Sequence, residues 1–284
     1  METSYEGVAI RAAGNVHRHV AEKLFQVLPR GSVVLDIAAG NGALALRLQN
    51  CGYRVICVDG NPAKFEVGGI QCTEVDLNRD FAAQIAATGG AAQFSAIVAV
   101  EVIEHLENPA AFLRGCARLL APDGVAIVTS PNLESAASRV RFATRGIPSW
   151  FSPEEAVNEH HVSPQFSWFM RVHAANASLS VAEEWCTSPE IGTTWADGWK
   201  TRLLYSKPVL RFLEHRWGAS GGDVRLWLLR PGAGTDTRVA PARYWSSSEP
   251  TQDEPAGHGD TDPPDRHRSE PRRPEPAGEA GPSR

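Results

Sequence analysis

Four acidic residues each end a short apolar segment in the first part of the chain: Asp36, Asp59, Asp76 and Glu101. A carboxylate in such a place can accept hydrogen bonds from ribose hydroxyls or hold a cationic group. If the segments are parallel strands of one sheet, their carboxyl ends lie along the edge where open α/β sheets bind ligands. The pattern therefore predicts a single ligand crevice lined by these four acids.

A glycine-bearing turn, Gly40-Asn41-Gly42, follows the first of these acids. The apolar run Val33–Ile37 comes before the turn, and Ala43–Asn50 continues with apolar residues at helical spacing. This order predicts a buried strand, a tight turn and a helix whose first amide groups face the turn. Because glycine has no side chain, a ligand can approach the backbone closely there. The segment therefore predicts a site for a nucleotide-like cofactor.

The same turn fits the loose G-x-G-x-x-A fingerprint of dinucleotide-binding proteins over residues 40–45. An NAD(P)-dependent oxidoreductase is therefore one alternative. Asp36 argues against it, because this carboxylate would lie close to the diphosphate and repel it, whereas it could hold a cationic amino group. A module that binds the cofactor without catalysing a reaction is a second alternative.

Glu101, Glu104 and His105 stand at positions i, i+3 and i+4, so on a helical turn they would share one face. Together with His161 they form a set that could chelate a divalent metal. The other interpretation is a loop at the start of a helix, whose acids bind backbone amides and neighbouring cations. We favour this second interpretation and expect no metal.

Histidines are also candidates for a general base that works near neutral pH. The chain offers His105, His160 and His161 in this region. We favour His161, because the segment before Ser163 is expected to fold over the strand ends as a substrate cap. The predicted catalytic residues are His161, His105 and Glu104.

Strands and helices alternate through the first 131 residues, and the alternation indicates how the acids are positioned. The expected strands are Val33–Ile37, Tyr53–Val58, Ile70–Val75, Phe94–Val100 and Val125–Thr129. The expected helices are Val16–Leu28, Ala43–Asn50, Phe81–Ala87 and Pro109–Leu120, with a turn at residues 122–124. Such alternation predicts a doubly wound α/β fold with a mostly parallel sheet covered on both faces.

The pattern changes after Pro131, where two insertions are expected to form a cap, at about residues 133–162 and 190–218. The other expected elements are an irregular helix over Asn132–Arg145, a helix over Gln165–Ala177, strands at Leu179–Trp185 and Val224–Leu229, and a helical insertion, Trp199–Trp217, interrupted by Pro208.

The first cap segment contains Ser138–Phe151, in which three arginines alternate with aromatic residues. Cations interleaved with aromatics suit an anionic membrane surface or an acceptor that carries phosphate. We favour a lid helix with its aromatics in the core and its arginines in solvent. Because Trp199–Trp217 is also basic and aromatic, a large apolar or anionic acceptor is a further hypothesis.

Composition separates the end of the chain from the rest. Residues 232–284 hold nine of the 20 prolines and few apolar residues. A segment that buries so little apolar surface cannot offset the entropy of ordering, so we predict a disordered tail. Residues 1–231 remain and are enough for one α/β domain.

Charge and cysteine content limit the partners and the compartment. Of the net charge of −5, the tail carries −3, from seven arginines and ten acids. The rest of the chain therefore has no basic excess for long phosphate contacts, so we expect no nucleic acid partner, and we infer no obligate protein partner. Five widely spaced cysteines and the lack of a signal-like or membrane-spanning apolar run predict a cytoplasmic protein.

These segments resemble the motifs of class I S-adenosylmethionine-dependent methyltransferases, especially the ubiquinone-type O-methyltransferases. VLDIAAGNG is similar to their first motif, VDGNP to the ribose-binding acid motif and EVDLN to the adenine-side acid. VEVIEHLENP and LLAPDGVAIVTSPN are similar to the motifs that follow the fourth strand and include the fifth. The resemblance covers roughly residues 30–132.

The resemblance implies a Rossmann-like, seven-stranded sheet with a final antiparallel strand, and S-adenosyl-L-methionine as cofactor. It implies that Asp36 and Gly40 serve the methionine part, that Asp59 serves the ribose, and that Asp76 and Leu77 serve the adenine. The full predicted cofactor set is Asp36, Ala38, Gly40, Asn41, Gly42, Asp59, Gly60, Asp76, Leu77 and Glu101. Ala38 stands where the family usually has glycine, and a positive φ there would be strained.

The implied activity is O-methylation of a small-molecule, lipid-linked or sugar acceptor. E-x-x-E-H followed by a later histidine is also similar to metal-dependent RNA 3′-terminal 2′-O-methyltransferases, which form an alternative. A peripheral contact with a membrane would accompany a lipid-linked acceptor.

Overall fold

The structure is a computed structural model that describes residues 2–13, 15–88, 93–187, 206–217 and 221–232. By its contacts the chain divides into Met1–Ala240 and Pro241–Arg284. The second unit, and with it nearly all of the predicted tail, lies outside the described residues. The boundary at residue 231 and the disorder of the tail therefore stay predictions.

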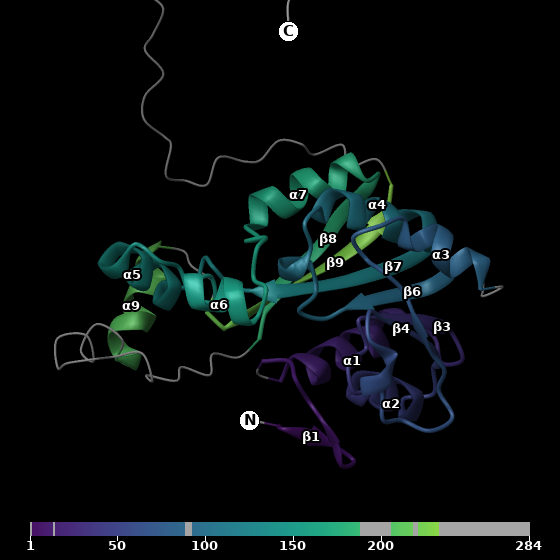
Figure 1. Ribbon diagram of the computed structural model, residues 1–284. Coiled ribbons are helices and arrows are strands. Elements are labelled where there is room, and N and C mark those ends of the chain that lie inside the picture. The colour runs from purple at the N-terminus through teal and green to yellow at the C-terminus, as the bar shows by residue number, and fades with distance from the viewer. Residues whose placement is uncertain (1, 14, 89–92, 188–205, 218–220, 233–284) are drawn as a thin grey trace, which may run out of the picture. The chain divides into compact units, whose positions relative to one another are not determined.

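Seven strands form one sheet in the order β5-β4-β3-β6-β7-β9-β8 (Figure 1). All neighbours run parallel except β9, which is antiparallel to both β7 and β8. This topology confirms the expected doubly wound sheet and its antiparallel strand. The strands are β3 (Val33–Ile37), β4 (Arg54–Asp59), β5 (Cys72–Glu74), β6 (Phe94–Ala99), β7 (Leu120–Pro131), β8 (Leu179–Cys186) and β9 (Val224–Pro231).

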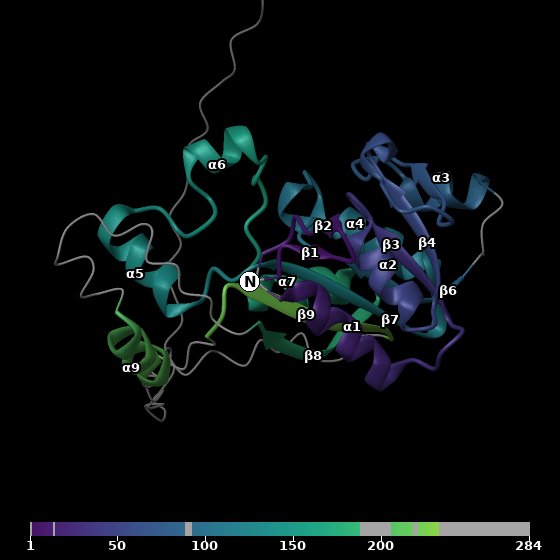
Figure 2. The ribbon, with the colours of Figure 1, turned by 90° about the horizontal axis from the view of Figure 1, so that it is seen from below.

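Helices cover both faces of the sheet, as Figures 1 and 2 show. On one face lie α1 (Val16–Val27) and α2 (Ala43–Asn50), and on the other lie α3 (Phe81–Ala87), α4 (Pro109–Leu119) and α7 (Ser167–Asn176). Each layer encloses its own apolar cluster. Because both faces of the sheet are buried, successive residues of a strand can all be apolar. On β9, Leu226 and Leu228 join the cluster under α1, while Trp227 and Leu229 join the cluster under α7.

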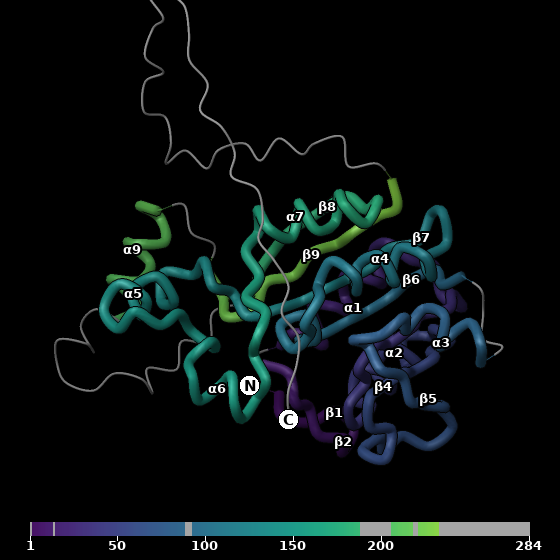
Figure 3. The backbone as a smooth tube through the Cα atoms, turned by 45° about the horizontal axis from the view of Figure 1, so that its top comes forward, coloured from purple at the N-terminus to yellow at the C-terminus, as the bar shows by residue number. Residues whose placement is uncertain are grey.

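Three further helices form the described part of the cap: α5 (Ala136–Arg145), α6 (Pro153–Asn158) and α9 (Lys207–Trp217). They lie together beyond the end of β7 in the views of Figures 1 and 3. Ala136 and Val140 of α5 pack against Leu210 of α9 in a small apolar cluster of their own. The insertions after β7 and β8 therefore come together in space.

Several expected elements differ from the observed ones. The predicted turn at residues 122–124 lies inside β7, where an irregularity lets Leu120 pair with Phe94 and Val125 pair with Ala96. A Cβ at Gly124 would lie 2.9 Å from the Phe94 carbonyl oxygen, so only glycine fits this close approach.

The helix expected from Gln165 begins at Ser167, and Pro208 stands in the first turn of α9 instead of interrupting a helix. Residues 199–205 of that predicted insertion lie outside the described residues. The sequence pattern did not predict the short hairpin of β1 (Ser4–Tyr5) and β2 (Val8–Ala9), and it did not predict α6. None of the described helices is long and apolar enough to cross a membrane.

Candidate active site

The glycine turn after β3 is tied to the end of β4. Asp59 ends β4, and its carboxylate accepts hydrogen bonds from the amides of Gly40 at 2.9 Å and Asn61 at 2.7 Å. The Ala39 amide donates to the Val58 carbonyl at 3.2 Å. Because β3 and β4 are parallel neighbours, their carboxyl ends meet here, as the spacing of the acids predicts.

The turn depends on its second glycine. Gly42 has φ +94°, and a Cβ there would lie 2.7 Å from side-chain atoms of both Phe65 and Val67. Asn41, between the glycines, donates from its side chain to Glu66 at 2.7 Å, and its backbone carbonyl accepts from the Glu66 amide. The segment after β4 therefore packs against the turn and leaves room only for glycine.

Ala38 adopts the left-handed backbone region, with φ +57°. An L-residue with a side chain pays about 1–2 kcal/mol for this conformation. The backbone of Ala38 is therefore strained, as expected for an alanine with a positive φ at this position. The turn keeps its shape because the surrounding hydrogen bonds fix the backbone on both sides of Ala38.

Asp36 lies beneath the turn at 2% exposure, and its Oδ2 atom has no hydrogen-bond partner in the described structure. Burial raises the pKa of Asp36 to about 8, and the negative charge of Asp59 adds to the rise. A nearby cation would lower the pKa of this buried carboxyl group and so favour its ionised form. The negative charge of Asp59 makes the turn a poor place for a diphosphate.

The third strand end carries Asp76 and Leu77, directly after β5. The side chain of Gln84 fixes this loop, since it accepts from the Asp76 amide at 3.1 Å and donates to the Asp76 carbonyl at 3.0 Å. The Asp76 carboxylate accepts from the Asn78 amide and pairs with Arg79 at 3.1 Å. Leu77 packs against the larger core cluster.

Glu101 follows β6 and has a left-handed backbone, with φ +52°. Its amide donates to the Thr129 hydroxyl at 2.9 Å, and its carboxylate accepts from the Ala13 amide at 2.6 Å. Burial raises the pKa of Glu101 to about 7, although the Ala13 amide opposes the rise and Asp223 adds to it. Glu101 therefore joins the segment before α1 to the strand ends.

Glu104, His105 and His161 form a second cluster next to these strand ends. One ligand atom from each lies within 4.8 Å of the others, and the rings of His105 and His161 meet edge to face at 4.8 Å between centroids. Glu104 is 0% exposed, and the Ser130 hydroxyl lies near its carboxylate. Burial raises the pKa of Glu104 well above its usual value, Glu101 adds to this, and the Ser130 hydroxyl opposes the rise.

Backbone groups hold His161 and the two residues that follow it. His161 Nδ1 lies 2.5 Å from the Trp150 carbonyl oxygen, and because a carbonyl only accepts, Nδ1 carries a proton and Nε2 is the ring nitrogen left for other chemistry. The amides of Val162 and Ser163 donate to the Glu104 carbonyl at 3.0 and 2.9 Å. Burial, and next His161, lower the pKa of His105, while hydrogen bonds to the backbone of Glu159 and His160 oppose this.

The predicted histidines and acids are only partly brought together. His160 is exposed and lies outside the cluster, and Glu101 turns to Ala13 instead of joining Glu104. The sequence analysis missed the Trp150 carbonyl, the Thr129 hydroxyl and the Ala13 amide. Two of these three are backbone groups, which any residue would supply, so no residue type could have marked them.

The expected lid helix is wrong in two details. Phe142 is 58% exposed instead of lying in the core, whereas Arg141 is buried and its guanidinium lies 4.0 Å from the Glu155 carboxylate. Glu155 also completes a capping box with Ser152 at the start of α6. Arg141 therefore links α5 to α6, and it does not face solvent.

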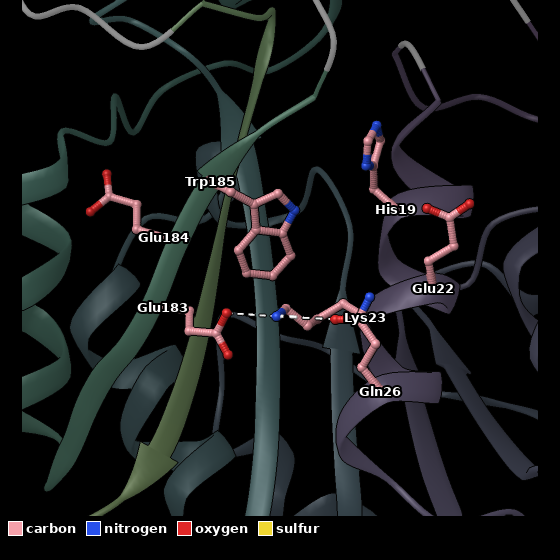
Figure 4. Close-up of a pocket in the computed structure, with 7 residues that line it drawn as sticks. All are labelled: His19, Glu22, Lys23, Gln26, Glu183, Glu184 and Trp185. Carbon is pink, nitrogen blue, oxygen red and sulfur yellow. Dashed lines mark hydrogen bonds and ion pairs between the residues drawn. The ribbon is translucent and has the colours of Figure 1, made fainter.

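A groove of about 270 Å³ opens elsewhere, between α1 and β8 (Figure 4). Lys23 crosses it to pair with Glu183 at 2.6 Å and lies over the Trp185 ring at 5.3 Å. None of the predicted site residues lines this groove.

Comparison with known proteins identifies a family for the chain. A family model described as a methyltransferase domain matches residues 11–174. The ubiquinone biosynthesis O-methyltransferase of Caulobacter sp. (strain K31) is 34% identical over 105 residues, which are 36% of this chain and 42% of the relative. The protein of the same name from Methylocella silvestris is 33% identical over 139 residues, 44% of this chain and 54% of the relative. The chain thus spans about half the length of these curated relatives.

Among solved structures, a SAM-dependent methyltransferase from Archaeoglobus fulgidus has the same fold. Its TM-score is 0.50 at 17% identity, over 75% of this chain and 93% of that chain. The matched residues 11–174 of this chain include the glycine turn, the acids at the strand ends and the histidine cluster. By this match the chain belongs to the methyltransferase-domain family, which confirms its resemblance to the class I S-adenosylmethionine-dependent methyltransferases.

Proposed function

We propose that this protein transfers the methyl group of S-adenosylmethionine to an oxygen of a small-molecule, lipid-linked or sugar acceptor. The observation that carries the proposal is the acidic pair at the glycine turn. Asp36 and Asp59 lie at adjacent strand ends, so a nearby cation would favour ionisation of Asp36, and the negative charge of Asp59 would repel a diphosphate. The curated relatives are O-methyltransferases by name, which supports oxygen as the methylated atom.

For the cofactor, the proposal assigns Asp36, Ala38 and the turn Gly40–Gly42 to the methionine part. Asp59 and Gly60 serve the ribose, and Asp76 and Leu77 serve the adenine. Glu101, which follows β6, belongs to the same cofactor set. The geometry supports these assignments because each residue lies in the turn or at the carboxyl end of a parallel strand.

The cofactor supplies an already activated methyl group when it is bound, so the protein has to orient the acceptor and remove its proton. His161 is the proposed base, because its Nε2 is the ring nitrogen left for this chemistry while the Trp150 carbonyl holds Nδ1. His105 packs against the His161 ring, and burial lowers its pKa, which favours the neutral form. Glu104, with its raised pKa, would keep or accept a proton beneath both rings.

The cap of α5, α6 and α9 would select the acceptor. Its exposed Phe142 and Phe212, together with basic residues on α5 and α9, support an apolar or anionic acceptor and a peripheral contact with an anionic membrane surface. A cytoplasmic location stays part of the proposal, and five free cysteines are compatible with it.

Transfer of an isotopic label tests the proposal. The full chain is incubated with methyl-labelled S-adenosylmethionine and a panel of phenols, polyprenyl-linked phenols, sugars and an RNA oligonucleotide. We expect label in a methyl ether of one of the small molecules. Binding of the cofactor without transfer to any acceptor would instead favour a non-catalytic module, and labelling of the RNA 3′ end would favour the RNA alternative.

The cluster of Glu104, His105 and His161 supports a second candidate, in which the same transfer uses a divalent metal. One carboxylate and two imidazoles are a suitable ligand set, and the ligand atoms of the three residues lie close enough together to share one divalent ion. These three residues would hold the metal, without Glu101. Calorimetric titration with Mg²⁺, Mn²⁺ or Zn²⁺ tests this candidate, since loss of any binding in Glu104→Gln would support the site and absence of binding in wild type would reject it.

A further inference from the structure

The cap segment of residues 133–162 leaves the sheet after β7 and returns to it at α7, and its two ends are joined directly. The Glu134 carboxylate accepts from the Ser167 amide at 2.9 Å and from the Ser167 hydroxyl at 2.6 Å. Glu134 itself donates its amide to the side chain of Asn132 at 3.1 Å. Glu134 thus satisfies a free amide at the start of α7 and closes the loop of the cap.

Arg225 of β9 binds both sides of this junction. Its guanidinium donates to Asn132 Oδ1 at 3.0 and 3.3 Å, lies 3.4 Å from the Glu134 carboxylate, and also contacts the Ser167 hydroxyl and Glu184. Glu184 of β8 is on the same face of the sheet as the Arg225 side chain that it contacts. Figure 4 shows its carboxylate pointing away from the groove toward which Glu183 and Trp185 point.

The junction is shielded from water. The side chains of Arg225, Glu184 and Glu134 are 9%, 16% and 23% exposed. Burial raises the pKa of Glu184, but the Ser167 hydroxyl and the Arg225 guanidinium outweigh this and bring it below its usual value. Removing the cation of a buried pair is much more damaging than removing a surface one, because carboxylates are left without compensation.

A few residues connect this junction to the histidine cluster. The chain returns through Val162 and Ser163, whose amides bind the Glu104 carbonyl, and reaches Ser167 four residues later. His161 directly precedes this stretch. The place of His161 therefore depends on both anchors, the Glu104 carbonyl and the Glu134–Ser167 junction.

We propose that Arg225 is a positioning residue that fixes both ends of the cap segment and so holds His161 over the strand ends. The inference rests on the proposed function only where it gives His161 a role in catalysis. The anchoring itself is independent of the acceptor and of methyl transfer.

Hydrogen exchange of the full chain tests the anchoring without an acceptor. The variants are Arg225→Met, Arg225→Lys and Glu134→Gln, and Arg230→Met on the same strand is the control. In Arg225→Met we expect amides of residues 135–166 to exchange at least about tenfold faster, while amides of β3, β4 and β6 and the affinity for S-adenosylhomocysteine stay as in wild type. Arg225→Lys should restore part of the protection, because it keeps the charge but not the planar fork of donors.

Two results would overturn the proposal: unchanged exchange over residues 135–166, or equal acceleration in the cap and in the central strands, which would show a general loss of stability. If Arg225→Met does not fold, Glu134→Gln carries the same expectation. This variant removes the charge of Glu134 from the junction, and it keeps the pair of Arg225 and Glu184, so no charge is left without a partner there. Failure of the wild type to bind S-adenosylhomocysteine would count against the proposed function, and the exchange result would still decide the role of Arg225.

Discussion

The carboxylate of Asp59 accepts a hydrogen bond from the amide of Gly40 at 2.9 Å, so the acid that ends β4 shapes the turn that follows β3. Its other oxygen accepts from Asn61 at 2.7 Å. Each carboxylate oxygen can accept a second hydrogen bond. Asp59 therefore retains acceptor capacity for the ribose hydroxyls of the proposed cofactor while it holds the turn in place.

Asp59→Ala should weaken the binding of S-adenosylhomocysteine by about 1–3 kcal/mol, the scale of lost hydrogen bonds to a charged group. Isothermal titration calorimetry measures the change. Asp123→Ala, which removes an exposed acid in the irregular part of β7, is the control and should leave affinity unaltered. If Asp59→Ala bound as tightly as wild type, Asp59 would have no place in the site.

Asp36 should make stability and cofactor affinity depend on pH in opposite directions. Its pKa is about 8 in the folded protein and 3.8 as the ordinary value, so the native state holds this proton between those limits and the unfolded chain does not. The free energy of unfolding should therefore fall as pH rises from about 4 to about 8, by up to about 1.4 kcal/mol per pH unit. A cationic cofactor favours the ionised form, so its affinity should rise over the same range.

Asp36→Asn provides the matched comparison, because the amide is similar in shape and does not titrate. The variant should be more stable than wild type at pH 8 without cofactor, and it should bind S-adenosylmethionine more weakly. Melting temperatures from pH 5 to pH 9 measure the first effect. Parallel pH profiles of the two proteins would contradict this account of Asp36.

Ala38→Gly should stabilise the protein, because glycine adopts a φ of +57° without the clash of a Cβ. The gain is expected to be about 0.5–1 kcal/mol, since the greater entropy of glycine in the unfolded chain offsets part of the relief. Ala39→Gly is the control: Ala39 has no positive φ, so this change should destabilise the protein. Urea denaturation compares the two, and equal effects would show that Ala38 is not strained.

His161→Asn should lower the rate of methyl transfer by about 10²–10⁴-fold if His161 is the base, because an amide cannot take up the proton. The acceptor is the one identified by label transfer, and the affinity for S-adenosylhomocysteine should not change. His160→Asn is the matched control, since His160 is exposed, and asparagine tolerates its left-handed backbone of φ +58°. Equal rates in both variants would exclude His161 as the base.

Truncation after Gly232 tests the predicted tail. Residues 233–284 are expected to bury little apolar surface, so their removal should leave the melting temperature and the cofactor affinity within experimental error of wild type. A marked fall in melting temperature would show that the tail packs against the rest of the chain.

The sequence predicts the turn after β3 and the acids at the neighbouring strand ends, because these features depend on local patterns. An apolar run, an acid and two glycines define β3 and the turn, and α2 has the predicted bounds Ala43–Asn50. The register of neighbouring strands then brings Asp36 and Asp59 together. Each of these signals lies within about ten residues.

The surroundings of Glu101 and His161 could not be predicted in the same way. Glu101 binds an amide 88 residues away, and His161 is oriented by a carbonyl of Trp150, so the partners are backbone groups without a residue signature. The anchoring by Arg225 needs a sheet order in which β9 lies between β7 and β8. Only the folded chain brings these groups together.

The central claim is that the turn after β3 takes a sulfonium cofactor instead of a dinucleotide. Isothermal titration calorimetry of the full chain with S-adenosylmethionine, S-adenosylhomocysteine and NAD tests it most directly. We expect both adenosyl compounds to bind with one site per chain, more weakly in Asp59→Ala, and NAD not to compete. Binding of NAD alone, lost in the same variant, would contradict the account.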